Sequence, residues 1–198
     1  MLAAVILSGG ASQRMGSPKA LLPYQGRPFL EHLLDITRHP KIGTRRIVLG
    51  AHAELIADAV RLAADEVVIN EDWEQGQLSS IQAAIRSLPA TTDGLMLCLI
   101  DHPLISADLV NDLVERFCSP QSPRPLIVLP VYQGKRGHPV IFSSAVYGEL
   151  LAAPMEQGAR SVVWAHGGEV AEMITSEQGC VLNLNDPQTV QRVLGPPG

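Results

Sequence analysis

The sequence has 198 residues, of which 46% are hydrophobic and 18% are charged, and its formal net charge at pH 7 is −5. This length favours one domain with its own core over residues 1–198, and the composition excludes a disordered chain. The charges are spread along the chain without a stripe of Lys and Arg. This pattern argues against a nucleic-acid partner and favours a small molecule.

No apolar stretch reaches the ~20 residues that cross a bilayer, and the N-terminus lacks the basic start and long apolar run of a secretory signal. The three cysteines, Cys98, Cys118 and Cys180, match no metal-ligand spacing and are expected to pack in the core. An odd number of cysteines without a disulfide framework favours a reducing compartment. We therefore expect a cytoplasmic protein without a membrane partner.

Short apolar runs, typical of buried strands, alternate with helical patterns along the chain. In chain order we expect a strand at 3–7, a helix at 29–38, a strand at 46–50, a helix at 53–64, a strand at 67–70, a helix at 78–88, a strand at 95–100, a helix at 107–117 and a strand at 126–131. The less regular remainder predicts a loop at 119–125, a glycine turn at 134–137, helices at 143–151 and 159–165, a strand near 180–182 and a last helix at 187–194. Apolar strands that alternate with helices predict an α/β fold, in which helices cover both faces of a parallel sheet.

The first strand runs directly into a glycine-rich loop that also carries two cations. Gly9 and Gly10 follow the strand, and Arg14 and Lys19 lie further along the same loop. Backbone N–H groups gathered in such a turn suit phosphate oxygens, and the two cations supply the positive charge that a triphosphate needs. The Walker and dinucleotide fingerprints are both absent. The loop therefore predicts a phosphate site of another kind, and the alternative is a structural turn with solvated basic residues.

A carboxylate follows a later strand, because Asp101 comes directly after the apolar run 95–100. In an open α/β sheet, ligands bind outside the carboxyl ends of the strands, so Asp101 is expected to face the same crevice as the glycine loop. A carboxylate in that place suits Mg²⁺, which takes one or two protein oxygens and keeps water and phosphate as its other ligands. The alternative is that Asp101 caps the next helix, although Ser106 is better placed to do so.

Four segments of the chain carry a resemblance to a known family. They are Leu7-Ser8-Gly9-Gly10-x-Ser12-x-Arg14-Met15-Gly16-x-x-Lys19, Gly76-Gln77-Leu78-Ser79-Ser80, Asp101-His102-Pro103 and Arg136-Gly137-His138-Pro139. In this order they closely resemble the signature segments of the molybdopterin cytidylyl- and guanylyltransferases, over nearly the whole chain. The resemblance implies a single-domain three-layer α/β/α sandwich with a Rossmann-like sheet, similar to the nucleotide-diphospho-sugar transferases. It also implies nucleotide contacts from Leu7, Ser8, Gly9, Gly10, Ser12, Arg14, Lys19, Gln77, Ser79 and Ser80.

The resemblance further implies the roles of the charged and amide side chains. Lys19, Arg14 and Asp101 would act in catalysis, and Asp101 and Asn185 would hold Mg²⁺. Asn183 is expected on the same side of a strand as Asn185. The acceptor would be bound by Arg136, His138 and Arg160.

Three further expectations concern local structure. Ser79 or Ser80 is expected to cap the helix at 78–88, and Asp186 is expected to cap the last helix, which begins at Pro187. Trp73 comes shortly before the two serines, and we expect it to pack in the core rather than to wall a pocket.

The reaction implied by the resemblance is Mg²⁺-dependent transfer of CMP from CTP to molybdopterin, with release of pyrophosphate. Three features favour CTP, namely the segment Leu21-Leu22-Pro23, the pair Ser79-Ser80 and the later Arg136–Pro139 segment. Gly9 instead resembles the guanylyl branch, so transfer of GMP from GTP is the near alternative. Transfer to another phosphorylated acceptor is a further one, and so is a non-catalytic nucleotide-binding maturation factor. A molybdoenzyme or its chaperone is a candidate protein partner.

Overall fold

Eight strands form the main sheet in the computed structural model, which describes residues 1–120 and 123–195. Their order across the sheet is β10 (Val170–Ile174), β7 (Ile127–Tyr132), β9 (Val140–Ser143), β6 (Gly94–Leu99), β1 (Leu2–Ser8), β4 (Ile42–Leu49) and β5 (Val67–Ile69), and β8 (Lys135–Arg136) pairs with β7. β1 runs parallel to β4 and β6, whereas β9 runs antiparallel to β6 and β7. A separate hairpin joins β2 (Pro23–Tyr24) to β3 (Arg27–Pro28). The predicted α/β class with a mostly parallel sheet is confirmed.

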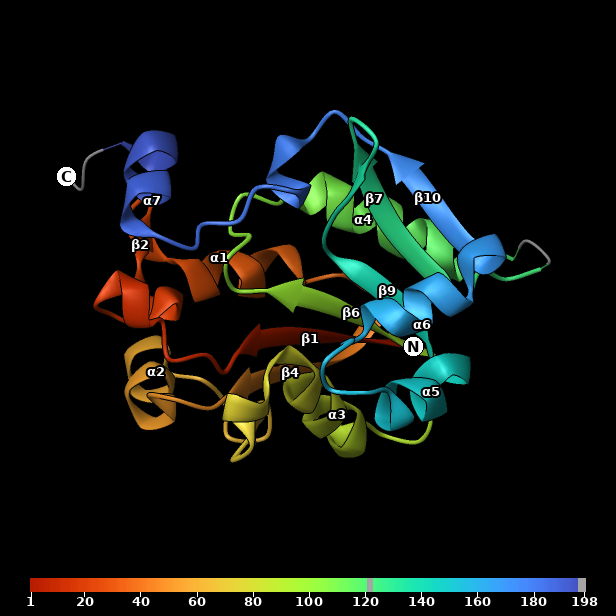
Figure 1. The fold of residues 1–198 in the computed structure, drawn as a ribbon, viewed down its shortest axis with the longest axis horizontal. Coiled ribbons are helices and arrows are strands. Elements are labelled where there is room, and N and C mark those ends of the chain that lie inside the picture. The colour runs from red at the N-terminus through yellow and green to blue at the C-terminus, as the bar shows by residue number, and fades with distance from the viewer. Residues whose placement is uncertain (121–122, 196–198) are drawn as a thin grey trace.

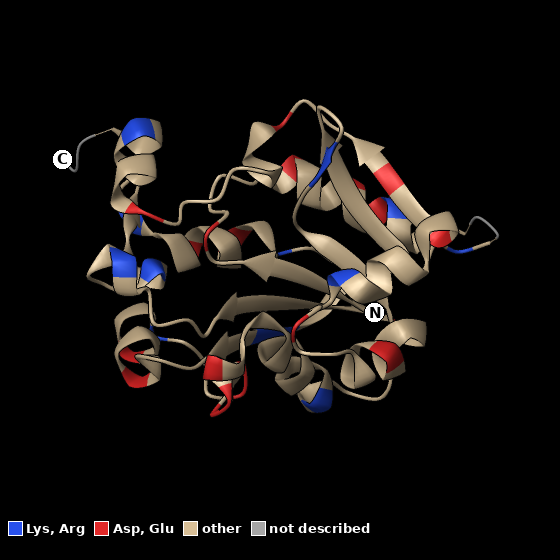
Figure 2. Ribbon diagram, in the orientation of Figure 1, with Lys and Arg blue, Asp and Glu red and all other residues tan. Residues whose placement is uncertain are grey.

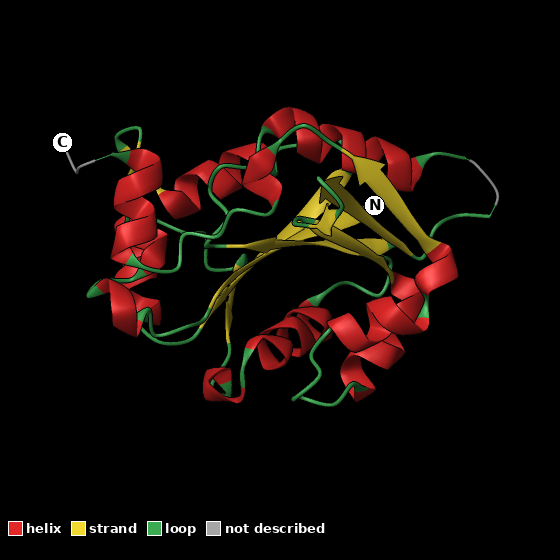
Figure 3. Cartoon of the chain, turned by 45° about the horizontal axis from the view of Figure 1, so that its top comes forward, coloured by secondary structure: helices red, strands yellow, loops and turns green. Residues whose placement is uncertain are grey.

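Helices cover both faces of this sheet (Figure 1 and Figure 3). One core cluster contains buried residues of α1 (Phe29–Ile36), α2 (Ala53–Val60) and α4 (Ala107–Cys118). The other contains residues of α3 (Gln77–Ser87), α5 (Tyr147–Ala152) and α6 (Arg160–Ala165). The last helix is α7 (Pro187–Leu194), and short 3-10 turns occur at Gln13–Met15, Lys19–Leu21, Trp73–Gln75, Ser144–Val146, Gly167–Glu169 and Gln178–Cys180.

The central strand β1 is apolar without interruption because helices cover both faces of the sheet at this strand. All seven of its residues are buried. Successive side chains of a strand point to opposite faces, so Ala4 and Ile6 join one core cluster while Val5 and Leu7 join the other. A strand covered on both faces has no solvent side on which a polar residue would be favourable. β1 therefore ends where its sequence turns polar, at Ser8.

The elements predicted before residue 132 are all present, with ends that differ by a few residues. The last helix, α7, has the predicted bounds, and the side chain of Asp186 caps it by accepting a hydrogen bond from the amide of Thr189 at 2.8 Å. Ser106 caps α4 in the same way through the amide of Leu109 at 3.0 Å. Cys98 and Cys180 are buried as expected, and Cys118 is half-buried. In the predicted loop 119–125, residues 121 and 122 lie outside the described residues.

The predicted strand near 180–182 is wrong. Cys180 ends a 3-10 turn, and the residues after it form irregular backbone, so Asn183 and Asn185 do not share one side of a strand. Cys180 is buried because it packs in one of the two core clusters, and its carbonyl oxygen accepts a hydrogen bond from the amide of His138 at 2.8 Å. A short apolar run in a buried loop cannot be distinguished from a short strand by its sequence pattern alone.

Three strands were missed in the same part of the chain, of which the shortest, β8, lies within the predicted glycine turn at 134–137. β9 was assigned in part to a helix at 143–151, but a 3-10 turn at Ser144–Val146 intervenes and α5 begins only at Tyr147. β10 lies at the edge of the sheet, and its last residue, Ile174, is 80% exposed. An edge strand of this kind has no regular alternation of apolar and polar residues, and that alternation is the usual sequence signal. Among the described residues, no helix has both the length and the apolar character needed to cross a membrane.

Candidate active site

A cavity of about 280 Å³ lies at the carboxyl ends of β1 and β6. In Figure 1 the arrowheads of both strands point to the side of the molecule where α2 and α7 lie. The cavity is lined by Asp101 and by eight of the ten predicted nucleotide contacts, namely Leu7, Ser8, Gly9, Gly10, Ser12, Lys19, Gln77 and Ser80. The remaining two, Arg14 and Ser79, are not part of the lining, and the side chain of Arg14 is exposed. The structure thus brings together the glycine loop and the carboxylate, as expected of the ends of parallel strands.

The glycine loop is held in shape by Ser12. This residue has a positive φ of 50°, and its hydroxyl accepts a hydrogen bond from the backbone amide of Lys19 at 3.1 Å. Its carbonyl oxygen accepts another from the amide of Met15 at 2.8 Å. Gly16, with φ of 70°, provides the left-handed turn that follows, a conformation that favours glycine. These bonds place the side chain of Lys19 at the cavity.

Lys19 meets a segment from the far end of the chain. Its ammonium nitrogen Nζ donates a hydrogen bond to Oδ1 of Asn185 at 2.5 Å. The loop that carries Asn185 is tied to the site because the amide of Leu184 donates to the carbonyl oxygen of Asp101 at 2.7 Å. Burial lowers the pKa of the Lys19 amine below its ordinary value, and the nearby carboxylate of Asp101 opposes that shift. Residues from three distant parts of the sequence therefore converge on one cavity.

Asp101 is a largely buried carboxylate at the end of the run that begins with β6. Its Oδ1 accepts a hydrogen bond from Nδ1 of His102 at 2.9 Å. Burial acts to raise the pKa of Asp101, but the hydrogen bond from His102 and the charge of Lys19 outweigh it, so the pKa lies below its usual value. Asp101 is thus an anion at neutral pH inside a cavity that also contains an ammonium group.

Ser79 and Ser80 do not cap α3, contrary to prediction. The cap is Gly76, whose φ of 98° suits glycine. Nδ2 of Asn70 donates hydrogen bonds to Oγ of Ser79 and Oγ of Ser80, both at 2.9 Å, and Ser79 in turn donates to the carbonyl oxygen of Gly76 at 2.8 Å. Asn70 fixes the start of α3 in this way, and only Ser80 reaches the cavity.

Trp73 and Gly50 were not predicted as parts of the site. Trp73 is only half-buried and lines the cavity, although it was expected to pack in the core. A Cβ at Gly50 would lie 2.5 Å from Cβ of Trp73 and 2.6 Å from the carbonyl oxygen of Gly9, so only glycine allows these two segments to approach. A glycine directly after an apolar strand was the one sequence signal for this contact.

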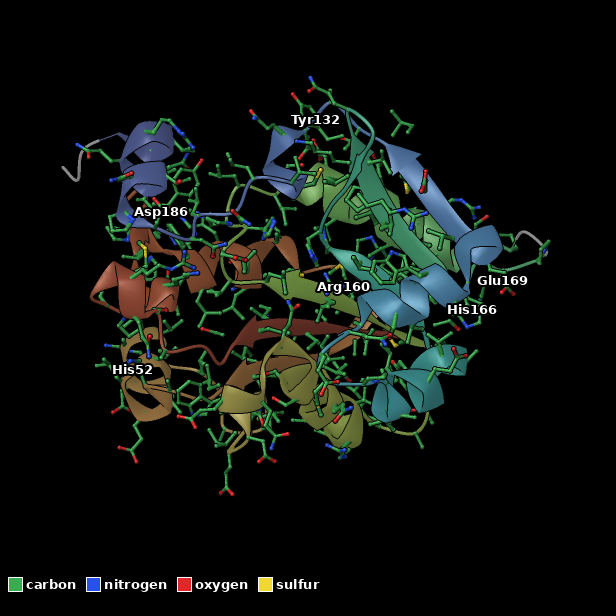
Figure 4. The ribbon with its side chains drawn as sticks, in the orientation of Figure 1. His52, Tyr132, Arg160, His166, Glu169 and Asp186 are labelled. Atoms are coloured by element: carbon green, nitrogen blue, oxygen red, sulfur yellow. The ribbon has the colours of Figure 1, made fainter. Side chains whose placement is uncertain are left out.

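A second cavity of about 440 Å³ lies beside the first and shares Gln77 with it. Its lining includes the three predicted acceptor residues, Arg136, His138 and Arg160. Nε of Arg136 pairs with Oε1 of Glu172 on β10 at 2.7 Å. Arg160, labelled at the start of α6 in Figure 4, lies over the ring of Trp164 at 5.4 Å. Elsewhere in the molecule both signs of charge are interspersed over helices and loops (Figure 2).

His138 is a buried member of this second cavity wall. Burial and the neighbouring His102 lower the pKa of His138 to about 4. Within the described residues, Nδ1 of His138 is buried and has no hydrogen-bond partner. The imidazole is therefore neutral at physiological pH, and any contact that it makes with an acceptor is that of an uncharged group.

The lowered pKa of His138 predicts a loss of stability in acid. Below about pH 6.5 the unfolded chain binds a proton at this residue that the folded chain does not, so the free energy of unfolding falls between about pH 6.5 and 4. A shift from 6.5 to about 4 corresponds to at most about 3–4 kcal/mol. Urea unfolding at pH 7.5 and 5 should show a smaller acid loss for His138→Gln than for the wild type. If the free energy of unfolding fell equally in both proteins, His138 would not be the source of the acid sensitivity.

Known proteins resemble this chain in both sequence and fold. A family model described as "MobA-like NTP transferase domain" matches residues 4–170. Nicotine blue oxidoreductase of Paenarthrobacter nicotinovorans is 31% identical over 153 residues, which cover 72% of this chain and 71% of that protein. Molybdenum cofactor guanylyltransferase of Vibrio atlanticus is 28% identical over 189 residues, covering 93% of this chain and 91% of that protein.

The fold comparison gives the same result. The crystal structure of Rv0371c from Mycobacterium tuberculosis matches with a TM-score of 0.83 at 28% identity, covering 98% of this chain and 97% of that one. A structure of Rv0371c in complex with manganese matches with a TM-score of 0.76 at 26% identity, over 98% of this chain and 97% of that one. Because the family model covers most of the sequence, the chain belongs to the MobA-like NTP transferase family of nucleotidyltransferases.

Proposed function

We propose that this protein transfers a nucleotidyl group from a nucleoside triphosphate to the phosphate of molybdopterin and releases pyrophosphate. The observation that carries the proposal is the pair of adjacent cavities that share Gln77. One contains the glycine loop, Lys19 and Asp101, which suit a triphosphate. The other is a separate space for an acceptor. Relatives named molybdenum cofactor guanylyltransferase support molybdopterin as that acceptor.

The chemistry asks little of the protein beyond positioning and charge. An oxygen of the acceptor's phosphate attacks the α-phosphorus, a new P–O bond forms, and the bond to the β-phosphate breaks as pyrophosphate leaves. The attacking oxygen is already anionic, so no general base is needed. The amides of Gly9 and Gly10 and the ammonium of Lys19 would hold the phosphates and stabilise the charge that develops on them.

The donor atoms at the site fit Mg²⁺. Asp101 offers an ionised carboxylate, of which only Oδ1 has a side-chain hydrogen bond among the described residues, and Asn185 offers a neutral amide oxygen 2.5 Å from the Lys19 ammonium. We infer that Asp101 is the main protein ligand and that Asn185 exchanges its bond to Lys19 for the cation. One or two protein oxygens are the usual number for Mg²⁺ bound with a nucleotide. When bound, Mg²⁺ supplies charge neutralisation at the phosphate oxygens.

We propose that the donor nucleotide is GTP rather than CTP. A Cβ at Gly9 would lie 3.2 Å from Oγ of Ser80 and 3.7 Å from Cβ of Trp73, so glycine leaves room in the cavity that alanine would fill. A guanine needs more of that room than a cytosine. The guanylyltransferase relatives support the same choice. CTP, favoured by the Arg136–Pro139 and Leu21–Pro23 segments, is the second candidate.

Substitution of Gly9 tests the choice of base. We expect Gly9→Ala to lower kcat/KM for GTP about tenfold more than for CTP, the scale on which a pocket responds to one methyl group. Steady-state rates with each nucleotide would measure the ratio. An unchanged ratio would show that position 9 does not select the base.

Identification of the product tests the reaction itself. With GTP, Mg²⁺ and molybdopterin, mass spectrometry should find molybdopterin that carries GMP. A product with CMP would favour the second candidate, and a product formed only with another phosphorylated compound would overturn the acceptor. Turnover of nicotine blue without any nucleotide product would instead align the chain with the relative named nicotine blue oxidoreductase.

A further inference from the structure

His102 lies between the two cavities and contacts a residue of each. It is only 5% exposed. Its Nδ1 donates a hydrogen bond to Oδ1 of Asp101 in the nucleotide cavity at 2.9 Å. Its ring centroid lies 5.1 Å from that of His138, which lines the second cavity, with an angle of 56° between the ring planes. Because the imidazole is buried, few orientations are open to it, and it can restrict the orientation of the Asp101 carboxylate to which it donates.

The backbone of this turn does not need the imidazole. The amide of His102 donates to the carbonyl oxygen of Leu99 at 3.0 Å, and the amide of Ile100 donates to that of Leu7 at 3.2 Å. The carbonyl oxygen of Asp101 accepts from the amide of Leu184 at 2.7 Å. Three backbone hydrogen bonds therefore fix the turn, and the bond from the imidazole acts on the carboxylate alone.

The carboxylate of Asp101 has no other side-chain hydrogen bond in residues 1–120 and 123–195. Lys19, the nearest ammonium group, donates to Asn185 instead. Without the bond from His102, the carboxylate group could rotate about its Cβ–Cγ bond, and that freedom would be lost each time a ligand bound. A bond that orients one oxygen leaves the other in a fixed place for a ligand in the cavity.

We propose that His102 is a positioning residue that fixes the carboxylate of Asp101 for a divalent cation, with His138 packed behind it. This inference rests on the proposed function, because it takes Asp101 as the cation's ligand. Groups that hydrogen-bond to a metal ligand typically contribute about 10- to 100-fold to metal affinity or activity. His102 should therefore affect cation binding more than it affects acceptor binding.

Asn and Leu substitutions at position 102 form a matched pair. The two side chains have nearly the same shape, and Nδ2 of Asn branches from Cγ as Nδ1 of His does, so it can donate to Asp101. We expect His102→Leu to weaken Mn²⁺ binding about tenfold or more, and His102→Asn to restore most of the affinity. Mn²⁺ would be titrated by electron paramagnetic resonance in the presence of a non-hydrolysable GTP analogue. kcat should fall in His102→Leu, whereas KM for molybdopterin should change little.

The outcomes separate this proposal from the proposed function. If Asp101→Asn loses Mn²⁺ binding while His102→Leu binds like the wild type, His102 has no positioning role and the proposed site stands. If Asp101→Asn also binds normally, the proposed cation site is itself wrong. Thermal unfolding would check that each variant folds. If His102→Leu does not fold, His102→Phe replaces it, because its ring keeps the planar shape of the imidazole without a donor, and normal binding in His102→Phe would equally overturn the proposal.

Discussion

Replacing Lys19 with alanine is expected to lower kcat by about 10²-fold or more, the usual effect of removing one electrostatic stabiliser from an active site. The ammonium of Lys19 is half-buried at the nucleotide cavity, where water screens its charge less than at the surface. Burial lowers the pKa of Lys19, so keeping this side chain charged inside the cavity is unfavourable for the folded protein. We attribute the retention of this charge to a need for it in the reaction.

A lysine on the surface provides the control for this variant. Lys41 lies at the amino end of β1, opposite the end that carries the glycine loop, because its carbonyl oxygen accepts a hydrogen bond from the amide of Leu2. Its ammonium group pairs with Glu115 at 2.5 Å, and 42% of its side chain is exposed. Lys41→Ala should have the wild-type rate, because a surface ion pair contributes little to stability and this one is remote from both cavities. Steady-state rates at saturating nucleotide would measure both variants. A Lys19→Ala enzyme with a near-normal kcat would contradict the role of Lys19.

Replacing Asp101 with asparagine is expected to lower kcat/KM by about 10²-fold or more. Asparagine has the same shape and still offers an oxygen to Nδ1 of His102, so the turn should remain folded. The negative charge is lost, and with it the strongest protein ligand for a divalent cation. Because the amide is neutral, Lys19 would also lose the opposite charge that opposes the lowering of its pKa.

Mg²⁺ dependence distinguishes loss of the cation from loss of the fold. The rate of Asp101→Asn should rise with Mg²⁺ concentrations that already saturate the wild type, since the variant binds the cation more weakly. Asp112→Asn, which changes an exposed carboxylate on α4, is the matched control and should match the wild type. Saturation of Asp101→Asn at the wild-type Mg²⁺ concentration, with an unchanged rate, would exclude Asp101 as a ligand.

The glycine loop and Asp101 could be predicted from sequence because their signals are local. An apolar strand buried on both faces ends abruptly, and the residue that follows must lie at the edge of the sheet. Since β1 and β6 are parallel neighbours, their carboxyl ends coincide, and the two functional segments meet. This rule of parallel sheets needs only the position of each strand's end.

The contacts between distant segments could not be predicted in this way. The bond between Lys19 and Asn185 joins residues 166 positions apart, and nothing in either segment specifies it. The pairing of Arg136 with Glu172 depends on β10, an edge strand that periodicity did not reveal. Ser79 or Ser80 was expected to cap a helix, but both hydroxyls instead accept hydrogen bonds from Asn70, which lies outside that helix but close to its start in space. Sequence patterns report burial and period, whereas these contacts depend on the packing of the whole fold.

The most direct test of the account is release of pyrophosphate with each of the four nucleoside triphosphates, in the presence of Mg²⁺ and with or without molybdopterin. We predict release with GTP, only when molybdopterin is present, and loss of that release in Asp101→Asn. Release with CTP alone would reassign the base and leave the reaction intact. Nucleotide binding without pyrophosphate release under every condition would contradict the account and point to a non-catalytic nucleotide-binding factor.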